Sequence, residues 1–228
     1  MVILLGNQKG GAGKSTLTIL LANYLKLVHD LPVAVIDMDD QRSVEDHYMD
    51  AQKLENPELY EVVGSDLSHF PALYKAVFSK APETIVIIDL PGKLDDDNLA
   101  AVFQKADLLI CPFIYEKMTF KSTVLFSMVL KKINPNIKMM YVPSRIKGTV
   151  VYDTEAQVKE VLNQYGPITP PIPDKQIFQR VSTYEIPTRM YPDILPTMDM
   201  IYKEAILPFI TNQDKKDGGK MAKMDIKI

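Results

Sequence analysis

The chain opens with MVILLGNQKGGAGKSTL, residues 1–17, and this stretch decides the predicted fold. The apolar run Val2–Leu5 has the length of a buried strand, and apolar residues recur every three or four positions after Lys14, as in an amphipathic helix. Glycines between a strand and a helix let the backbone approach phosphate oxygens, which the helix N-terminus attracts. The stretch therefore predicts a phosphate-binding loop.

The loop departs at one position from the usual pattern G-x-x-x-x-G-K-[ST]. Gln8 stands where that pattern has its first glycine, and Lys9 follows directly. Lys14 can reach the terminal phosphates of a nucleotide, and Ser15 can ligate magnesium. The nucleotide-binding residues predicted in this segment are Lys9, Gly10, Gly11, Ala12, Gly13, Lys14, Ser15 and Thr16.

Composition places the chain among ordinary globular proteins. Its 228 residues are enough for one sizeable core, and 46% hydrophobic with 24% charged residues argue against disordered and fibrous classes. Cys111 is the sole cysteine, so an internal disulfide or a cysteine-based metal site cannot form within one chain. The first residues lack the pattern of a secretory signal. We therefore expect a single domain in the reducing cytoplasm.

Short apolar runs alternate with helical spacings along the chain. This alternation predicts an α/β fold with a mainly parallel sheet flanked by α-helices. The expected strands are Val2–Leu5, Val33–Ile36, Ile85–Ile88, Leu108–Ile110 and Met139–Val142, with a weaker one around Ile168. A closing helix is expected over Met198–Ile210, and residues 211–228, rich in Lys, Asp and Gly, are expected to form a flexible polar tail.

The segment NQKGGAGKST resembles the deviant Walker A motif, K-G-G-x-G-K-[ST], of the ParA/Soj/MinD ATPases. Lys9 matches the signature lysine of that family, so Gln8 is no defect. The resemblance implies a single-domain P-loop NTPase fold over residues 1–210 that binds ATP and Mg²⁺. It also implies an ATP-bound homodimer in which Lys9 reaches the partner's ATP and stabilises the transferring phosphoryl group.

Two further segments resemble motifs of the same family. VAVIDMDDQRS, residues 33–43, is similar to I-D-x-D-P-Q, and this implies that Asp37 lies near the magnesium and that Asp39 orients the attacking water. Asp40 stands where the family has proline, which leaves the geometry of this turn open. Two solvated loop carboxylates are the alternative interpretation.

TIVIIDLPG, residues 84–92, resembles the Walker B motif. A carboxylate at Asp89 can hold magnesium through water, and Gly92 stands where many members have proline, so the switching of this loop stays open. The predicted catalytic residues are Lys9, Lys14 and Asp39, and the predicted metal ligands are Ser15, Asp37 and Asp89.

A fainter resemblance concerns the adenine base. VPSRIKGT and PPIPDKQIFQRV are similar to later base-binding segments of the family. The implied adenine-contacting residues are Ser144, Arg145, Pro173 and Asp174, and a surface position for Arg145 is the alternative.

The resemblance implies slow ATP hydrolysis that drives the partition or positioning of DNA. Gln8 is typical of the DNA-segregating ParA-type members, so non-specific DNA and an activating protein of unknown identity are the expected partners. Lys131, Lys132, Lys138, Arg145 and Lys147 are candidates for a basic DNA-binding face, and a solvated helix end is the alternative.

Two other functions remain open at this point. One is an ATP-gated switch that recruits a protein with negligible hydrolysis, and the other is a MinD-like membrane-positioning ATPase. Membrane attachment is disfavoured because the final segment KMAKMDIKI lacks large aromatic residues and is interrupted by Asp225.

Overall fold

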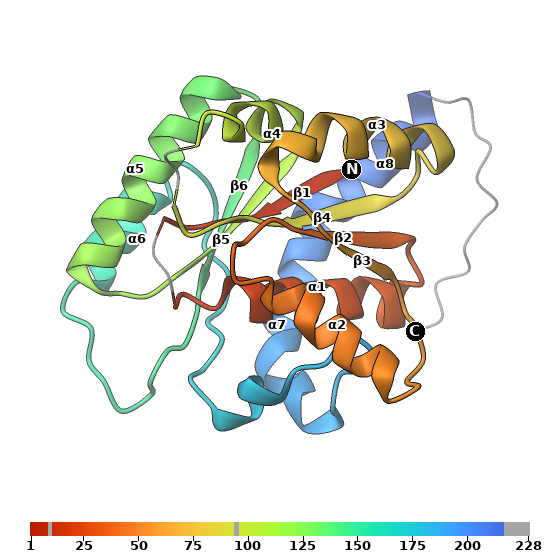
Figure 1. Cartoon of the computed structure of the whole chain (residues 1–228). Coiled ribbons are helices and arrows are strands. Elements are labelled where there is room, and N and C mark those ends of the chain that lie inside the picture. Colours follow the sequence, from red (N-terminus) through yellow and green to blue (C-terminus); the bar gives the residue numbers. More distant parts are fainter. Residues whose placement is uncertain (9–10, 94–95, 217–228) are drawn as a thin grey trace.

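The computed structural model describes residues 1–8, 11–93 and 96–216. Within these residues the strands form one six-stranded, all-parallel sheet in the order β3-β2-β4-β1-β5-β6 (Figure 1). The strands are β1 Val2–Leu5, β2 Val33–Asp37, β3 Glu61–Gly64, β4 Ile85–Asp89, β5 Leu108–Phe113 and β6 Lys138–Pro143. The predicted α/β fold with a parallel sheet is confirmed.

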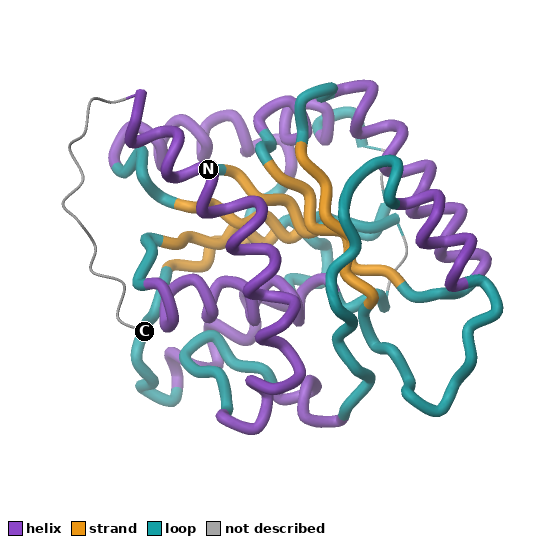
Figure 2. The backbone as a smooth tube through the Cα atoms, turned by 180° about the vertical axis from the view of Figure 1, so that it is seen from behind, coloured by secondary structure: helices purple, strands orange, loops and turns teal. Residues whose placement is uncertain are grey.

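Helices cover both faces of the sheet, and Figure 2 shows the strands between two helical layers. One layer contains α1 Lys14–His29, α2 Ser43–Lys53 and α7 Tyr191–Ile201, followed by a π-helical turn, Tyr202–Ile206, and α8 Leu207–Lys216. The other contains α3 Phe70–Lys80, α4 Leu99–Lys105, α5 Lys117–Ile133 and α6 Glu155–Leu162. Short 3₁₀ turns lie at Leu67–His69, Gln176–Arg180 and Thr188–Met190.

Strand β1 explains why continuous apolar runs become central strands. Ile3 and Leu5 pack into the core beneath α1, while Val2 and Leu4 pack into the core on the opposite face. Successive side chains of a strand point to opposite faces, so a strand covered on both sides must be apolar at every position. All four residues of β1 are buried.

The five main strand predictions are confirmed, and four of these strands are one to three residues longer than expected. Ile168 forms an isolated bridge with Tyr141 rather than a strand. The prediction missed β3, which has only four residues and lies at the sheet edge with Glu61 exposed. An edge strand with one polar face lacks the continuous apolar run on which the prediction relied.

The chain after Met190 is helical for longer than expected. The α7 helix begins before the predicted helix and contains Pro196, and α8 extends to Lys216 into the segment expected to be a tail. Pro208 lies just after the π-helical turn, so its missing N–H falls where the regular i→i−4 hydrogen bonding is already interrupted. The remaining residues of the predicted tail, 217–228, lie outside the described residues.

The sheet order places three strand ends beside one another. β1 lies between β4 and β5, and the register pairs Leu5 with Asp89 and Asp37 with Asp89. The carboxyl ends of β1, β2 and β4 therefore meet at one edge of the sheet. In open α/β sheets, ligands bind at such an edge, where the strand order reverses.

Candidate functional site

The loop between β1 and α1 has the backbone geometry that its glycines predict. Gly11 and Gly13 have φ values of 80° and 84°, in the left-handed region that favours glycine. Gly13 is the N-cap of α1, and the first turn of this helix contains no acidic residue. The positive end of the helix dipole is therefore available to an anion. Lys9 and Gly10 lie outside the described residues, so the structure does not place these two predicted site residues.

Lys14 and Asp39 form an ion pair at this helix N-terminus. The Lys14 Nζ lies 3.4 Å from an Asp39 carboxylate oxygen, and the two side chains are 7% and 15% exposed. The structure thus brings together two residues that the sequence analysis assigned to catalysis. Phosphate oxygens bound at this end of α1 would compete with Asp39 for the Lys14 ammonium group.

The turn after β2 forms without the family's proline. The Arg42 N–H donates to the Asp39 carbonyl at 2.9 Å, and the Gln41 N–H donates to the Asp39 side chain at 3.1 Å. Asp40 is exposed and is not required to close the turn. The geometry left open by the sequence is therefore a closed turn that holds Asp39 beside Lys14.

Asp89 lies fully buried at the end of β4, opposite the start of α1. The Ser15 Oγ donates to one Asp89 oxygen at 2.6 Å, and the Thr18 Oγ1 donates to the other at 3.3 Å. Burial raises the pKa of Asp89 to about 7, and the charges of Asp37 and Asp39 act in the same direction. The Ser15 hydrogen bond and the Lys14 charge oppose this shift.

The pairing of Ser15 with Asp89 fits a magnesium site. Mg²⁺ prefers oxygen ligands and is usually held by one or two protein groups together with substrate phosphates and water. A hydroxyl and a carboxylate of adjacent elements, 2.6 Å apart beside the phosphate loop, supply such oxygens. Among the described residues, no group of three or more His, Cys, Asp or Glu side chains could hold a metal ion by itself.

Asp37 organises the segment that follows β2. One of its oxygens accepts the Asp39 N–H at 3.1 Å, and the other accepts the N–H groups of Val44 at 2.8 Å and Glu45 at 3.1 Å. Burial raises the pKa of Asp37, whereas these hydrogen bonds and the Arg42 charge lower it. A carboxylate at the N-terminus of α2 is also favoured by the helix dipole. Its predicted place near magnesium stays a prediction.

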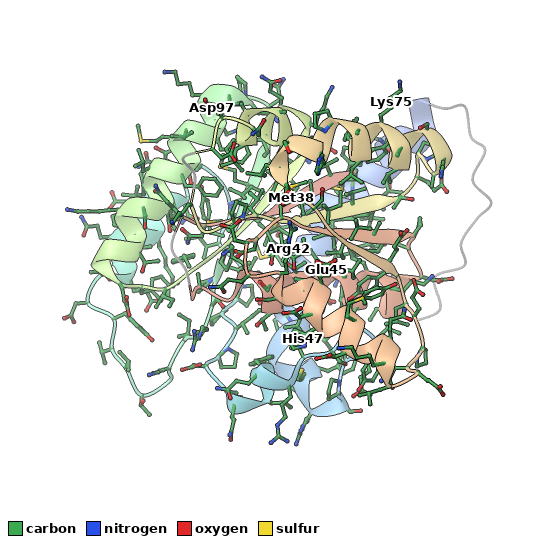
Figure 3. The ribbon with its side chains drawn as sticks, in the orientation of Figure 1. Met38, Arg42, Glu45, His47, Lys75 and Asp97 are labelled. Atoms are coloured by element: carbon green, nitrogen blue, oxygen red, sulfur yellow. The ribbon has the colours of Figure 1, made fainter. Side chains whose placement is uncertain are left out.

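Arg42 ties the same segment to the neighbouring strand end. Its guanidinium donates to the Asp37 carbonyl, to the Ser65 carbonyl at 2.8 Å and to the Asp66 carboxylate at 2.7 Å. Figure 3 shows how Met38, Arg42, Glu45 and His47 follow one another from the end of β2 into α2. The segment that carries Asp39 is therefore fixed between the end of β2 and the start of α2.

Two adjoining pockets meet at the N-terminus of α1, where Gly13, Thr16 and Arg145 line both. The first, of about 520 Å³, is lined by Lys14 and Asp39, two of the predicted catalytic residues, and by part of the predicted phosphate loop. It is lined by Gly11, Gly13, Lys14, Ser15, Thr16, Asp39, Asp40, Gln41, Ser43, His47, Gly92, Lys93 and Arg145. Its volume and polar lining suit a triphosphate with its counter-ion.

The second pocket, of about 200 Å³, lies between α1 and the chain after β6. All four predicted adenine-contacting residues line it. Its other lining residues are Gly13, Thr16, Leu17, Leu20, Ile172, Lys175, Phe178 and Gln179. Five apolar side chains line it together with six polar ones, and such a mixed lining is found in small-molecule pockets.

Long-range contacts assemble this second pocket. A parallel bridge between Ile146 and Pro173 brings the two predicted base-binding segments together. The Arg145 Nη1 donates to the Gly11 carbonyl at 2.9 Å, and its Nε lies 3.6 Å from the Asp174 carboxylate. A methyl group on Gly13 would lie 3.0 Å from the Ser144 Oγ. The loop between β1 and α1 and the second pocket are therefore in direct contact.

Several pocket residues were not predicted as site residues. Leu17 and Leu20 belong to the apolar repeat after Lys14 that predicted an amphipathic helix, and besides packing in the core they line the second pocket. His47 is not spaced from other residues in the way that metal ligands are, so the sequence does not mark it as a site residue. It lines the first pocket only because α2 packs beside α1. Lys93 directly follows Gly92, so its position next to the segment that resembles Walker B could have indicated that it lies in the site.

The five residues predicted to form a basic DNA-binding face do not lie together in the structure. Lys138 begins β6, whereas Arg145 and Lys147 follow its carboxyl end, so the strand separates them by about 20 Å or more. The Lys131 Nζ donates to the carbonyls of Pro135 and Ile137 and thus closes the end of α5. The solvated helix end, the alternative given above, is the better description of this lysine.

Among the described helices, none has the length and apolarity needed to cross a membrane.

A family model described as the CobQ/CobB/MinD/ParA nucleotide binding domain matches residues 3–189. This range is more than half of the chain and includes both pockets. No curated protein matches the chain.

Solved structures of similar fold include a plasmid partition protein, an ATP complex of McdA and a cell division ATPase. A putative plasmid partition protein from Borrelia burgdorferi bound to AMPPNP is 21% identical, with 88% of this chain and 98% of that chain covered and a TM-score of 0.65. The ATP complex of a McdA variant from Cyanothece is 19% identical over 89% and 95% of the two chains, with a TM-score of 0.67. The cell division ATPase MinD of Pyrococcus furiosus is 19% identical over 89% and 98%, with a TM-score of 0.66.

Proposed function

The chain belongs to the CobQ/CobB/MinD/ParA nucleotide binding domain family, and from this premise we propose that it is a Mg-ATP-dependent ATPase that dimerises on ATP and positions DNA. The observation that carries the proposal is the pair of adjoining pockets around the N-terminus of α1. One offers apolar walls for a base, and the other offers the helix N-terminus, Lys14 and carboxylates for a triphosphate. A nucleotide that spans both pockets would cross Gly13, where a side chain would collide with Ser144.

In the proposed mechanism the phosphates bind the N–H groups at the start of α1 and the Lys14 ammonium. Lys14 then moves its charge from Asp39 to the phosphates, which leaves the Asp39 carboxylate free to accept a proton from a water molecule and orient it. Ser15 and Asp89, with Asp37 beside them, are the residues that would hold Mg²⁺. When bound, the ion neutralises charge on the phosphate oxygens.

Two parts of the proposal, dimerisation on ATP and DNA as the target, rest on the family resemblance and on the proteins of similar fold. Lys9 matches the lysine that reaches the partner's ATP, and a second cation would stabilise the phosphoryl group only where two protomers meet. The Borrelia protein of similar fold is a plasmid partition protein, which supports DNA as the cargo. Hydrolysis would dissolve the dimer and release the DNA.

The proposal is tested by retention of the purified protein on non-specific DNA with ATP, with ADP and without nucleotide. We expect retention only with ATP, and we expect Lys9→Ala and Lys14→Ala to abolish it. Equal retention of Lys9→Ala and wild type, with equal dimerisation, would contradict the cross-subunit role of Lys9.

Phosphate release measured with and without DNA tests the enzymatic part. Wild type is expected to turn over ATP slowly, whereas Asp39→Ala should show only background. If wild type does not exceed that background under either condition, the protein-recruiting switch replaces the ATPase as the function.

A further inference from the structure

Helix α5 presents an apolar face to solvent at the side of the molecule. Leu125, Met128 and Val129 are 52%, 53% and 40% exposed, although they lie in a helix whose other side is core. Figure 1 shows α5 at the outer edge of its layer, with its outward side free of other described elements. The spacing i, i+3 and i+4 puts the three side chains on one stripe of the helix.

Two lysines bracket this stripe. Lys121 lies four residues before Leu125, and Lys132 lies three residues after Val129; both are exposed. From Lys121 to Lys132 the helix extends about 17 Å. Neither lysine forms an ion pair with a described carboxylate. The sequence of α5 contains four lysines and no acidic residue. We call Lys121, Leu125, Met128, Val129 and Lys132 the α5 face.

The opposite side of α5 is firmly attached to the phosphate loop. The Asn7 Nδ2 donates to the Thr123 Oγ1 at 3.0 Å and to the Pro112 carbonyl at 2.7 Å. A methyl group on Gly6 would lie 2.9 Å from the Phe126 ring. A displacement of α5 would therefore displace the loop that begins at Gly6.

We propose that the α5 face is a docking site for an amphipathic helix of a partner protein whose apolar stripe is flanked by acidic residues. An apolar stripe at helical spacing is the surface into which the ridges of a second helix pack. The lysines at both ends favour carboxylates at the corresponding ends of the partner helix.

A second copy of the chain is a poor occupant of the same face. A two-fold axis would pair the α5 faces of two copies and place lysines against lysines, whether the helices run parallel or antiparallel. Like charges placed together oppose association. An anionic lipid surface would accept the lysines, but the exposed stripe is only about one turn long and contains no aromatic residue, whereas interfacial helices bury a larger apolar face.

The probe for this proposal is a designed, dye-labelled helical peptide of about 15 residues with leucines at i, i+3, i+4 and i+7 and glutamates on both flanks. A second peptide carries lysines in place of the glutamates. Fluorescence anisotropy with wild-type protein should show at least about tenfold tighter binding of the acidic peptide. No preference for the acidic peptide would overturn the proposal.

Matched variants locate the binding. Leu125→Ser with Met128→Ser should weaken binding of the acidic peptide about tenfold or more, because both side chains contribute apolar area. Lys121→Glu with Lys132→Glu should reverse the preference between the two peptides. Leu54→Ser, which alters a residue 74% exposed after α2, is the control and should bind like wild type. Coincident thermal melting curves, monitored by circular dichroism, establish that all variants are folded.

Two further outcomes would assign the face to another occupant. Flotation of wild-type protein with phosphatidylserine vesicles, lost in Leu125→Ser with Met128→Ser, would identify a membrane surface instead. Concentration-dependent dimers in the absence of nucleotide, lost in the same variant, would identify self-association. Either result contradicts the docking of a partner helix, and neither depends on the ATPase proposal.

Discussion

The Asp39→Asn variant is expected to bind ATP more tightly than wild type while losing turnover. In the structure, Asp39 holds the Lys14 ammonium at 3.4 Å, so a nucleotide must displace the carboxylate before its phosphates can take its place. Asparagine keeps the size of the side chain but removes the negative charge that competes with the phosphates. It also removes the group that we propose orients the attacking water.

The expected size of the effect follows from the ion pair. Two unit charges 3.4 Å apart interact by about 5 kcal/mol at an effective dielectric constant of about 20. Much of this is offset because asparagine still accepts a hydrogen bond and because a carboxylate that is 15% exposed keeps part of its hydration. We therefore expect a net gain of about 1.4 kcal/mol, or about tenfold in Kd.

The assay is titration with a fluorescent ATP analogue in the presence of Mg²⁺, and the control is Asp40→Asn. Asp40 lines the same pocket with the same charge, but it is exposed and forms no ion pair with a described cation. Asp40→Asn should change the Kd by no more than about threefold, through long-range charge alone. If Asp39→Asn binds no more tightly than Asp40→Asn, the competition between Asp39 and phosphate is refuted.

Three further predictions concern the same site. Gly13→Ala should lower the free energy of unfolding in urea by about 1–2 kcal/mol, because φ is 84° and the new methyl group meets the Ser144 Oγ at 3.0 Å. Gly148 has no neighbour within 4 Å of an added methyl group, so Gly148→Ala should change the free energy of unfolding by no more than about 0.5 kcal/mol. Equal losses in the two variants would contradict this reasoning. Asp89→Asn should abolish the gain in ATP affinity that Mg²⁺ gives the wild type over EDTA, and an undiminished gain would remove Asp89 from the metal site. Arg145→Ala should weaken binding of the ATP analogue about tenfold and lower the free energy of unfolding by no more than about 1 kcal/mol, because its ion pair with Asp174 and its hydrogen bond to the Gly11 carbonyl are both partly exposed; unchanged affinity would place Arg145 outside the nucleotide site.

The sequence predicted best where a local pattern is enough. The central strands are buried on both faces, so their apolar runs stand out, and the phosphate loop needs glycines at positions with positive φ. It failed for β3, α2 and α3, because an edge strand and surface helices with few buried residues leave only weak periodicity. The closing helix runs through Pro208 to Lys216, whereas the prediction ended it at Ile210, because the polar residues after Ile210 give no apolar period to follow.

The sequence predicted many of the individual site residues, but it did not predict which of them lie next to one another. The pairing of Lys14 with Asp39 depends on a turn that the missing proline left uncertain. His47 had no signal at all, because only the packing of α2 against α1 brings it to the phosphate pocket. Conversely, the proposed basic face consisted of residues that are neighbours in sequence order but lie at opposite ends of β6.

By itself the sequence determined the class of fold, the position of the phosphate loop and the residue types around it, since buried strands, amphipathic helices and positive-φ glycines are specified over a few neighbouring residues. Only the tertiary structure decided which groups meet. Ser15 bonds to Asp89 across 74 residues, and Arg145 bonds to Gly11 across 134. These contacts arise because β1 lies between β4 and β5 in the sheet, so strand ends that are distant along the chain share one edge.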